Sequence, residues 1–147
     1  MRVVVDASVW LSASDPKEDG HEESVAFLSE AAAQAFRFSE PGLVLAEVAA
    51  ATARKSRDAQ KGRDAMAALQ RTPGIEFIEL TILRAEQAGE CASRHFLRGA
   101  DSVYAALASE LGAELVTLDG ELQERSAGEV RALSPKEWIG AHLPSQP

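Results

Sequence analysis

The sequence predicts an α/β protein, a three-layer α/β/α sandwich around a short, mostly parallel central sheet. Short segments rich in β-branched and apolar residues alternate along the chain with longer segments in which apolar residues recur at helical spacing. Residues 2–5 read Arg-Val-Val-Val, and a second apolar segment of this kind lies at 114–118. Strands that are separated by helices pair in parallel through right-handed crossovers. The predicted order is therefore β-α-α-β-α-α-β-α-α-β-α-β-α.

The first half of the chain is predicted from apolar spacing and from turn residues. The expected elements are a strand at 2–5, a helix beginning at 7–13, a loop at 14–20, a helix at 21–35, a strand at 36–39, a helix from Pro41 to about Arg57 and a helix at 58–70. The loop is indicated by its Ser, Asp, Pro and Gly residues. Pro41 is placed in the first turn of its helix because proline loses no hydrogen bond there.

The second half continues the same alternation. The expected elements are a strand at 75–80, a helix after Thr81, a helix at 101–111, a strand at 114–118, a short helix after Gly120, a strand at 130–133 and a helix from Pro135. Thr81 and Asp101 are placed at helix starts, and Gly112 at a helix end. Residues 1–143 are expected to form one domain, and 144–147 (Pro-Ser-Gln-Pro) a frayed end.

Composition and charge argue against several classes of protein. The 147 residues are 46% hydrophobic and 26% charged, as in ordinary globular domains and unlike disordered chains. The net charge of −8 argues against a protein that holds nucleic acid by bulk positive charge, although a cluster of cation-binding carboxylates also raises the negative count. A single cysteine, Cys91, excludes an intrachain disulfide, and no apolar segment is long enough for a membrane span or a signal peptide. We expect a soluble, cytoplasmic protein that does not bind membranes.

Acidic residues follow two predicted strands, at the places where ligands bind to an open parallel sheet. Asp6 follows the strand at 2–5 and Asp119 follows the strand at 114–118, so both are expected at the carboxyl edge of the sheet. Asp101 lies at a predicted helix start. Each of these aspartates could also act as a simple helix cap, because aspartate stabilises helix N-termini.

Glu47 has no such explanation, because it is the only charged residue in the apolar stretch 42–51. A charge on that helix face is costly unless a metal ion or a cationic group pairs with it. Magnesium and manganese prefer oxygen ligands, and such an ion can activate water for displacement at phosphorus. Four carboxylates at one sheet edge suit this chemistry. Their mutual repulsion is expected to raise their pKa values when no cation separates them.

Four segments of the chain together resemble the motifs of PIN-domain ribonucleases, and they are most similar to the VapC-type toxins of toxin–antitoxin pairs. The segments are Val3-Val4-Val5-Asp6-Ala7-Ser8-Val9-Trp10-Leu11, Leu45-Ala46-Glu47-Val48, Gly99-Ala100-Asp101-Ser102-Val103-Tyr104-Ala105-Ala106-Leu107-Ala108 and Leu115-Val116-Thr117-Leu118-Asp119. Their order and spacing agree with the family over nearly the whole chain.

This resemblance implies a PIN-like fold and an endoribonuclease that depends on Mg²⁺ or Mn²⁺. Carried over position by position, the acidic site consists of Asp6, Glu47, Asp101 and Asp119. Polar helpers that orient carboxylates or water are Ser8 and Thr117. The implied reaction is hydrolysis of an RNA phosphodiester bond that leaves a 5′-phosphate. The resemblance also implies a small antitoxin partner and a homodimer.

A basic stretch follows the segment that carries Glu47. Its residues are Arg54, Lys55, Arg57, Lys61, Arg63 and Arg71. One interpretation is a solvated helical face with ion pairs along the helix. The other is a track for the RNA backbone, because phosphate contacts position a substrate without reading its sequence. The same stretch could also receive an acidic antitoxin.

Two other functions remain compatible with these residues. An aspartate-nucleophile phosphohydrolase would use Asp6 covalently, but such enzymes usually carry a second aspartate two residues later, where this chain has Ser8. A PIN-like module could also bind a partner or RNA without cutting it. The presence of all four acids argues against that module, and a failure to bind magnesium or manganese would favour it.

Overall fold

The computed structural model describes residues 1–143, and the frayed end predicted at 144–147 lies outside the described residues. The order of strands and helices is the predicted one. The elements are β1 (Arg2–Val5), α1 (Ala7–Ser14), α2 (His21–Ala33), β2 (Arg37–Pro41), α3 (Leu43–Ser56), α4 (Ala59–Gln70), β3 (Ile75–Ile78), α5 (Ile82–His95), α6 (Gly99–Leu111), β4 (Glu114–Val116), α7 (Gly120–Ser126), β5 (Ala132–Leu133) and α8 (Pro135–His142).

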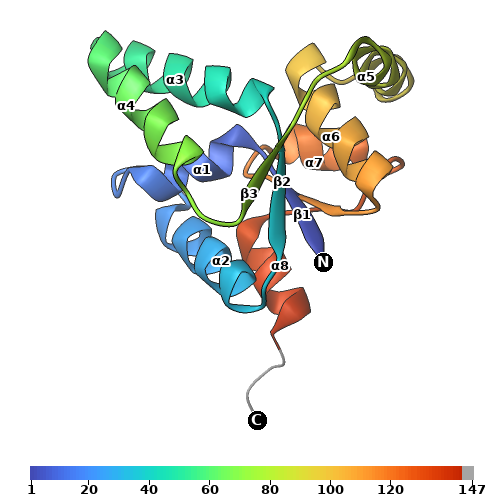
Figure 1. The fold of residues 1–147 in the computed structure, drawn as a ribbon. Helices are drawn as coiled ribbons and strands as arrows, with labels where there is room; N and C mark the ends of the chain where they lie inside the picture. The colour runs from blue at the N-terminus through green and yellow to red at the C-terminus, as the bar shows by residue number, and fades with distance from the viewer. Residues whose placement is uncertain (144–147) are drawn as a thin grey trace.

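The five strands form one parallel sheet in the order β3-β2-β1-β4-β5. In the central strand β1, Val3 is aligned with Phe38 of β2, and Val4 with Leu115 of β4. Helices α1 to α4 lie on one side of the sheet and α5 to α7 on the other, while α8 packs against α2 (Figure 1). This arrangement confirms the predicted three-layer sandwich.

The sheet grows in one direction from β1 to β3 and in the opposite direction through β4 and β5. Such a reversal leaves a crevice beside the carboxyl ends of the two central strands, and ligands of open parallel sheets bind there. In this chain the crevice lies at the ends of β1 and β4. Asp6 directly follows β1, and the chain after Val116 leads to Asp119, so both aspartates reach the crevice.

Apolar packing places the helices against the sheet. The three valines of β1 are fully buried, as expected for the central strand of a parallel sheet. Trp138 of α8 packs edge-on against Phe27 of α2, and Trp10 of α1 packs edge-on against Phe38 of β2. Among the helices of residues 1–143, none combines the length and the apolar character that crossing a lipid bilayer requires.

The prediction that Pro41 begins a helix is wrong, because Pro41 is the last residue of β2. Pro41 is aligned with Ile78 of β3, and the next residue, Gly42, donates its N–H to the Ile78 carbonyl at 3.0 Å. The aligned pairs of β1 and β2 are at Arg2 and Val3, so Pro41 lies beyond them and its missing N–H breaks no ladder bond with β1. The helix begins two residues later, at Leu43.

The prediction that Asp101 opens a helix is also wrong, by two residues. Phe96 adopts a left-handed conformation that ends α5, and Arg98 is extended. Helix α6 then begins at Gly99, and the N–H of Ser102 bonds to the carbonyl of Arg98. Asp101 therefore lies inside the first turn, and Arg98 holds the cap position.

Candidate active site

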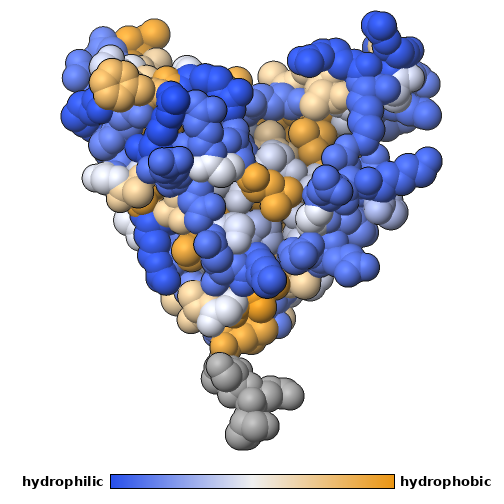
Figure 2. Space-filling model, turned by 180° about the vertical axis from the view of Figure 1, so that it is seen from behind, coloured by the Kyte–Doolittle hydropathy of each residue, from blue (hydrophilic) through white to orange (hydrophobic). Residues whose placement is uncertain are grey.

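The four predicted acids line one cavity of ≈ 330 Å³ at the carboxyl edge of the sheet. The lining residues include the carboxylates Asp6, Glu47, Asp101 and Asp119, together with Ser8, Leu11, Ala51, Arg54 and Arg98. We call this space the acidic cavity. Seen from behind, the molecule is hollowed between two upper lobes, which correspond to α3 with α4 and α5 with α6 in Figure 1 (Figure 2).

Asp6 is buried at the end of β1, and its carboxylate does not cap α1 although it precedes that helix. Its Oδ2 atom instead accepts hydrogen bonds from Ser8 Oγ at 2.6 Å and from Thr117 Oγ1 at 2.9 Å. Burial raises the pKa of Asp6, and these two hydroxyls oppose the increase. The helix-cap interpretation of Asp6 therefore fails in this structure.

Ser8 and Thr117 each use their hydroxyl twice. Ser8 Oγ accepts the N–H of Leu118 at 3.1 Å, and Thr117 Oγ1 accepts the N–H of Asp119 at 3.0 Å. Because both hydroxyls also donate to Asp6, they tie the chain after β4 to the end of β1. These contacts match the positioning that the sequence predicts for the two residues, while their effect on catalysis stays a prediction.

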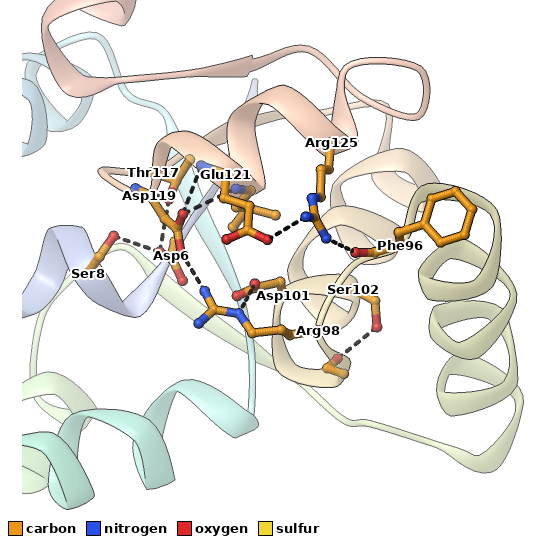
Figure 3. Close-up of polar contacts among 12 residues, drawn as sticks. Asp6, Ser8, Phe96, Arg98, Asp101, Ser102, Thr117, Asp119, Glu121 and Arg125 are labelled. Carbon is orange, nitrogen blue, oxygen red and sulfur yellow. Dashed lines mark hydrogen bonds and ion pairs between the residues drawn. The ribbon is translucent and has the colours of Figure 1, made fainter.

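Asp119 is a true helix cap, and it also faces the acidic cavity. Its Oδ1 accepts the N–H groups of Glu121 and Leu122, in the first turn of α7, at 3.0 and 3.2 Å. Its Oδ2 accepts Arg98 Nη2 at 2.6 Å (Figure 3). The cap interpretation of Asp119 is therefore confirmed for Oδ1, and it leaves Oδ2 facing the acidic cavity, where its role stays a prediction.

Arg98 is a residue of the acidic cavity that the sequence reasoning missed. Its Nε donates to Oδ2 of Asp101 at 2.9 Å, while Nη2 reaches Asp119 from the same guanidinium. Helical spacing gave no signal for it, because Arg98 is extended and lies before α6, outside the helix that was predicted from Asp101. The contact with Asp119, which is distant in sequence, needed the fold.

Glu47 projects from α3, and its Oε1 accepts a 2.6 Å hydrogen bond from the hydroxyl of Tyr104 on α6. Burial raises the pKa of Glu47, and the tyrosine opposes the increase. In the described part of the chain the direct partner of Glu47 is thus a hydroxyl group, where the sequence predicted a cation. Tyr104 belongs to the quoted motif around Asp101, but its role was not predicted.

Glu40 is a buried carboxyl group that the sequence reasoning did not single out. It is fully buried at the end of β2, and its Oε1 accepts the N–H of Val5 at 2.9 Å, one residue before Asp6. Its Oε2 is buried without a hydrogen-bond partner among residues 1–143. Burial raises the pKa of Glu40 well above its usual range. The error at Pro41 hid this residue, because it placed Glu40 in a loop before a helix.

The residues of the basic stretch that follows Glu47 do not form one continuous track on the surface. Arg54 lines the acidic cavity, whereas Lys55 and Lys61 line an adjoining groove of ≈ 540 Å³ together with Lys17. The cavity and the groove share Leu11 and Ala51, so they meet on the surface. 

Two of the other basic side chains, those of Lys55 and Arg63, have local contacts. Lys55 forms ion pairs with Asp15 and Glu18 of the loop after α1. Arg63 bonds to Gln60 within α4, and Arg57 ends α3 in a left-handed conformation. These contacts favour the solvated surface of the first interpretation, although the ion pairs of Lys55 reach the loop after α1 and do not run along the helix. Of the six basic residues in the stretch, Arg54 is the one that lines the acidic cavity.

The pKa values of Asp6 and Glu47 are raised, as the sequence predicts, but the larger cause is different. Removal from water is the main cause for both groups, and repulsion from Asp101 adds a smaller increase. Each carboxylate is partly sheltered by the helices around the crevice. We therefore attribute the shifts to the depth of the cavity more than to crowding of charges.

The donor chemistry of the acidic cavity fits a hard divalent cation, since four carboxylates from separate elements line it. Within residues 1–143, however, no three acidic, histidine or cysteine side chains converge closely enough to hold a metal ion. Hydroxyls hold Asp6 and Glu47, and Arg98 bridges the other two acids. A cation that uses the Oδ2 atoms of Asp101 and Asp119 must therefore displace Arg98.

Comparison with known proteins identifies a family. The family model described as "PIN domain" matches residues 3–128, a span that contains all four acids. No curated protein sequence matches the chain significantly.

Solved structures with the same fold share little sequence with the chain. The sarcin-ricin loop-cleaving toxin VapC20 of Mycobacterium tuberculosis has a TM-score of 0.71 and 20% identity, covering 88% of this chain and 97% of that one. VapBC2 from Rickettsia felis, bound to a promoter DNA fragment, has a TM-score of 0.66 and 16% identity, covering 91% and 98%. A toxin–antitoxin complex from Klebsiella pneumoniae has a TM-score of 0.61 and 18% identity, covering 90% and 97%. At such identities, the likeness establishes the fold.

Proposed function

Because the chain belongs to the PIN-domain family, we propose that it is a metal-dependent endoribonuclease that hydrolyses RNA phosphodiester bonds. The observation that carries the proposal is the acidic cavity, where Asp6, Glu47, Asp101 and Asp119 line one space at the carboxyl edge of the sheet. These acids come from four separate segments of the chain, so simple helix capping does not account for their meeting. The cation is Mg²⁺ or Mn²⁺, which supplies activation of water and neutralisation of phosphate charge when bound.

The residues of the acidic cavity would have two different roles, cation binding and positioning. The four carboxylates would hold the cation, and the hydroxyls of Ser8 and Thr117 hold Asp6 in place. The 5′-phosphate product follows from attack of water at phosphorus and departure of the 3′-oxygen. No serine or histidine nucleophile is needed.

The RNA backbone would run from the acidic cavity into the adjoining groove. The two share Leu11 and Ala51, and three lysines (Lys17, Lys55 and Lys61) line the groove within a chain of net charge −8. The groove also holds Asp15 and Glu18, which pair with Lys55, so a phosphate there would take the place of these carboxylates. Lysines bind phosphate as point charges and read no sequence. Arg54 stands in the cavity itself, where a phosphate next to the scissile bond would lie.

The chain would act as the toxin of a toxin–antitoxin pair. Two of the solved structures with the same fold are described as a toxin and as a toxin–antitoxin complex, and this supports a small protein partner for the chain. A homodimer is part of the same proposal. Sedimentation of the purified protein tests the dimer, and co-purification with the product of a neighbouring gene tests the antitoxin.

The test of the enzymatic activity is cleavage of a mixed RNA pool by purified protein, with Mn²⁺ or Mg²⁺ and with a chelator. Asp101→Asn serves as the control for a contaminating nuclease. We expect cutting that needs the metal and that the variant loses. Equal cutting by the variant would remove the enzymatic proposal. Absence of both cutting and metal binding would support a PIN-like module that binds without cleaving, and a trapped phospho-aspartate at Asp6 would support a phosphohydrolase.

A further inference from the structure

Arg98 places its guanidinium between two of the four carboxylates of the acidic cavity (Figure 3). Nε donates to Oδ2 of Asp101 at 2.9 Å, and Nη2 donates to Oδ2 of Asp119 at 2.6 Å. The two acids belong to the starts of different helices, α6 and α7. One cationic side chain therefore joins two acids that would otherwise repel each other.

The contacts of Asp119 show why this position matters for a cation. Backbone N–H groups of α7 already donate to its Oδ1, so Oδ2 is the oxygen left to bind a cation. Arg98 Nη2 donates a hydrogen bond to that same Oδ2. A guanidinium and a divalent cation on the same oxygen would bring positive charges together, which is costly at such short range. Binding of a cation to Oδ2 of Asp119 therefore competes with the contact of Arg98 there.

The exposure and the weak ion pairs of Arg98 allow a cation to displace its side chain. Its side chain is 66% exposed, so packing does not lock it in place. Exposed ion pairs stabilise a protein only weakly, so a doubly charged ion can replace this one. Once displaced, the guanidinium stays at the rim of the cavity because its backbone is fixed at the start of α6.

We propose that Arg98 exchanges ligands: it neutralises Asp101 and Asp119 until a divalent cation takes their oxygens, and it then holds a backbone phosphate of the bound RNA. Arginine suits the second role because its planar fork binds phosphate through two parallel hydrogen bonds. This inference rests on the proposed nuclease function. It assigns a substrate contact to a residue outside the four acids.

The first test measures Mn²⁺ binding by calorimetry without RNA. Removal of a competitor makes Mn²⁺ bind Arg98→Ala about threefold to tenfold more tightly than the wild type, the size expected from two exposed ion pairs. The matched control is Arg131→Ala, because Arg131 is a similarly exposed arginine that pairs with Glu114 at the opposite edge of the sheet. The control keeps the wild-type affinity.

The second test measures RNA binding with Ca²⁺, at several salt concentrations, with a non-cleaved RNA analogue. Loss of one phosphate contact lowers the slope of log affinity against log salt by about 0.7 for single-stranded RNA. We expect this change for Arg98→Ala in the cation-loaded protein and not in chelator. Arg98→Lys, which keeps the charge, retains the slope and separates loss of the contact from damage to the fold.

The outcomes separate this inference from the proposed function. If Mn²⁺ binds the wild type and Asp101→Asn weakens it, while Arg98→Ala changes neither the affinity nor the salt slope, the inference is overturned and the nuclease proposal stands. A change in only one of the two readouts also overturns the exchange of ligands. If Mn²⁺ does not bind the wild type, the proposed function itself fails.

Discussion

The hydroxyl of Tyr104 donates a 2.6 Å hydrogen bond to Oε1 of Glu47 and so joins α6 to α3 across the carboxyl edge of the sheet. The two helices belong to opposite layers of the sandwich (Figure 1). The tyrosine is fully buried, and both burial and the neighbouring carboxylate raise its pKa, so it remains a donor at neutral pH. This bond therefore fixes where the carboxylate of Glu47 points.

Tyr104→Phe removes that donor with little change in volume. We expect the free energy of unfolding to fall by about 1.5–3 kcal/mol, which is the size for a hydrogen bond to a charged group. The pKa of Glu47 should rise further, because the hydroxyl now opposes the effect of burial. Urea denaturation and titration by NMR measure both quantities. If Tyr104→Phe unfolds at the same urea midpoint as the wild type, the account is contradicted. A double-mutant cycle with Glu47→Gln isolates the interaction energy of the pair.

Thr117→Val keeps the shape of a buried side chain and removes its hydroxyl. Thr117 donates to Asp6 and accepts from the N–H of Asp119, so both groups lose a partner. We expect a loss of about 1–3 kcal/mol in the free energy of unfolding and weaker Mn²⁺ binding, by about 10–100-fold. Thr117→Ser, which keeps the hydroxyl, should retain most of the Mn²⁺ affinity. Equal affinities for the valine and serine variants would show that Thr117 does not position Asp6.

Glu40→Gln should stabilise the protein more as the pH rises. Burial raises the pKa of Glu40 in the folded protein well above its usual range. Between the usual pKa and the raised pKa, the unfolded chain therefore binds fewer protons at this site, and the free energy of unfolding falls as pH increases. Glutamine can still accept the N–H of Val5 but cannot ionise. The unfolding free energies of wild type and variant, measured over a pH series, should diverge in that window.

Two comparisons separate the pH effect of Glu40 from the effects of other carboxylates. Asp6 and Glu47 also have raised pKa values and give a slope of the same sign, so only the difference between wild type and Glu40→Gln reports on Glu40. Glu40→Ala leaves the N–H of Val5 without its acceptor and should cost about 1–3 kcal/mol at every pH. Parallel pH curves for wild type and Glu40→Gln would contradict the assignment.

As the pH is lowered, the protein should begin to lose Mn²⁺ affinity at a higher pH than a site built of carboxylates with ordinary pKa values would. A cation binds the ionised form of Asp6 and Glu47, and burial makes both groups keep their protons to a higher pH. As pH falls, Mn²⁺ affinity is therefore lost in a window above the usual carboxylate range. Calorimetry in buffers of different ionisation enthalpy should detect protons released on binding near the acidic end of this window. No release there would contradict the raised pKa values.

Much of the fold could be predicted because its signals are local. The buried valines of β1 and the alternation of strands with helices fixed the class and the element order. The error at Pro41 arose because proline is compatible with both a first helical turn and a strand end, and the choice depended on how far β1 pairs with β2. The start of α6 was missed because the left-handed turn at Phe96 is not encoded by glycine.

The remaining residues in and around the acidic cavity could not be predicted from local sequence signals either. The acids were found because their spacing forms a motif. Arg98 reaches Asp119 across 21 positions of sequence, and Tyr104 reaches Glu47 across 57. Glu40 became visible only once β2 was seen to extend past it. Such contacts depend on how the elements pack, which periodicity does not report.

The most direct test of the central claim is the rate of RNA hydrolysis at saturating Mn²⁺ by variants that neutralise one carboxylate at a time. The variants are Asp6→Asn, Glu47→Gln, Asp101→Asn and Asp119→Asn, with Glu86→Gln, an exposed site on α5, as the matched control. The account predicts losses of at least about 100-fold for each of the four, because even residues that merely orient metal ligands cost 10–100-fold. The control should keep the wild-type rate. Wild-type rates in any three of the four variants would contradict a nuclease built on these carboxylates.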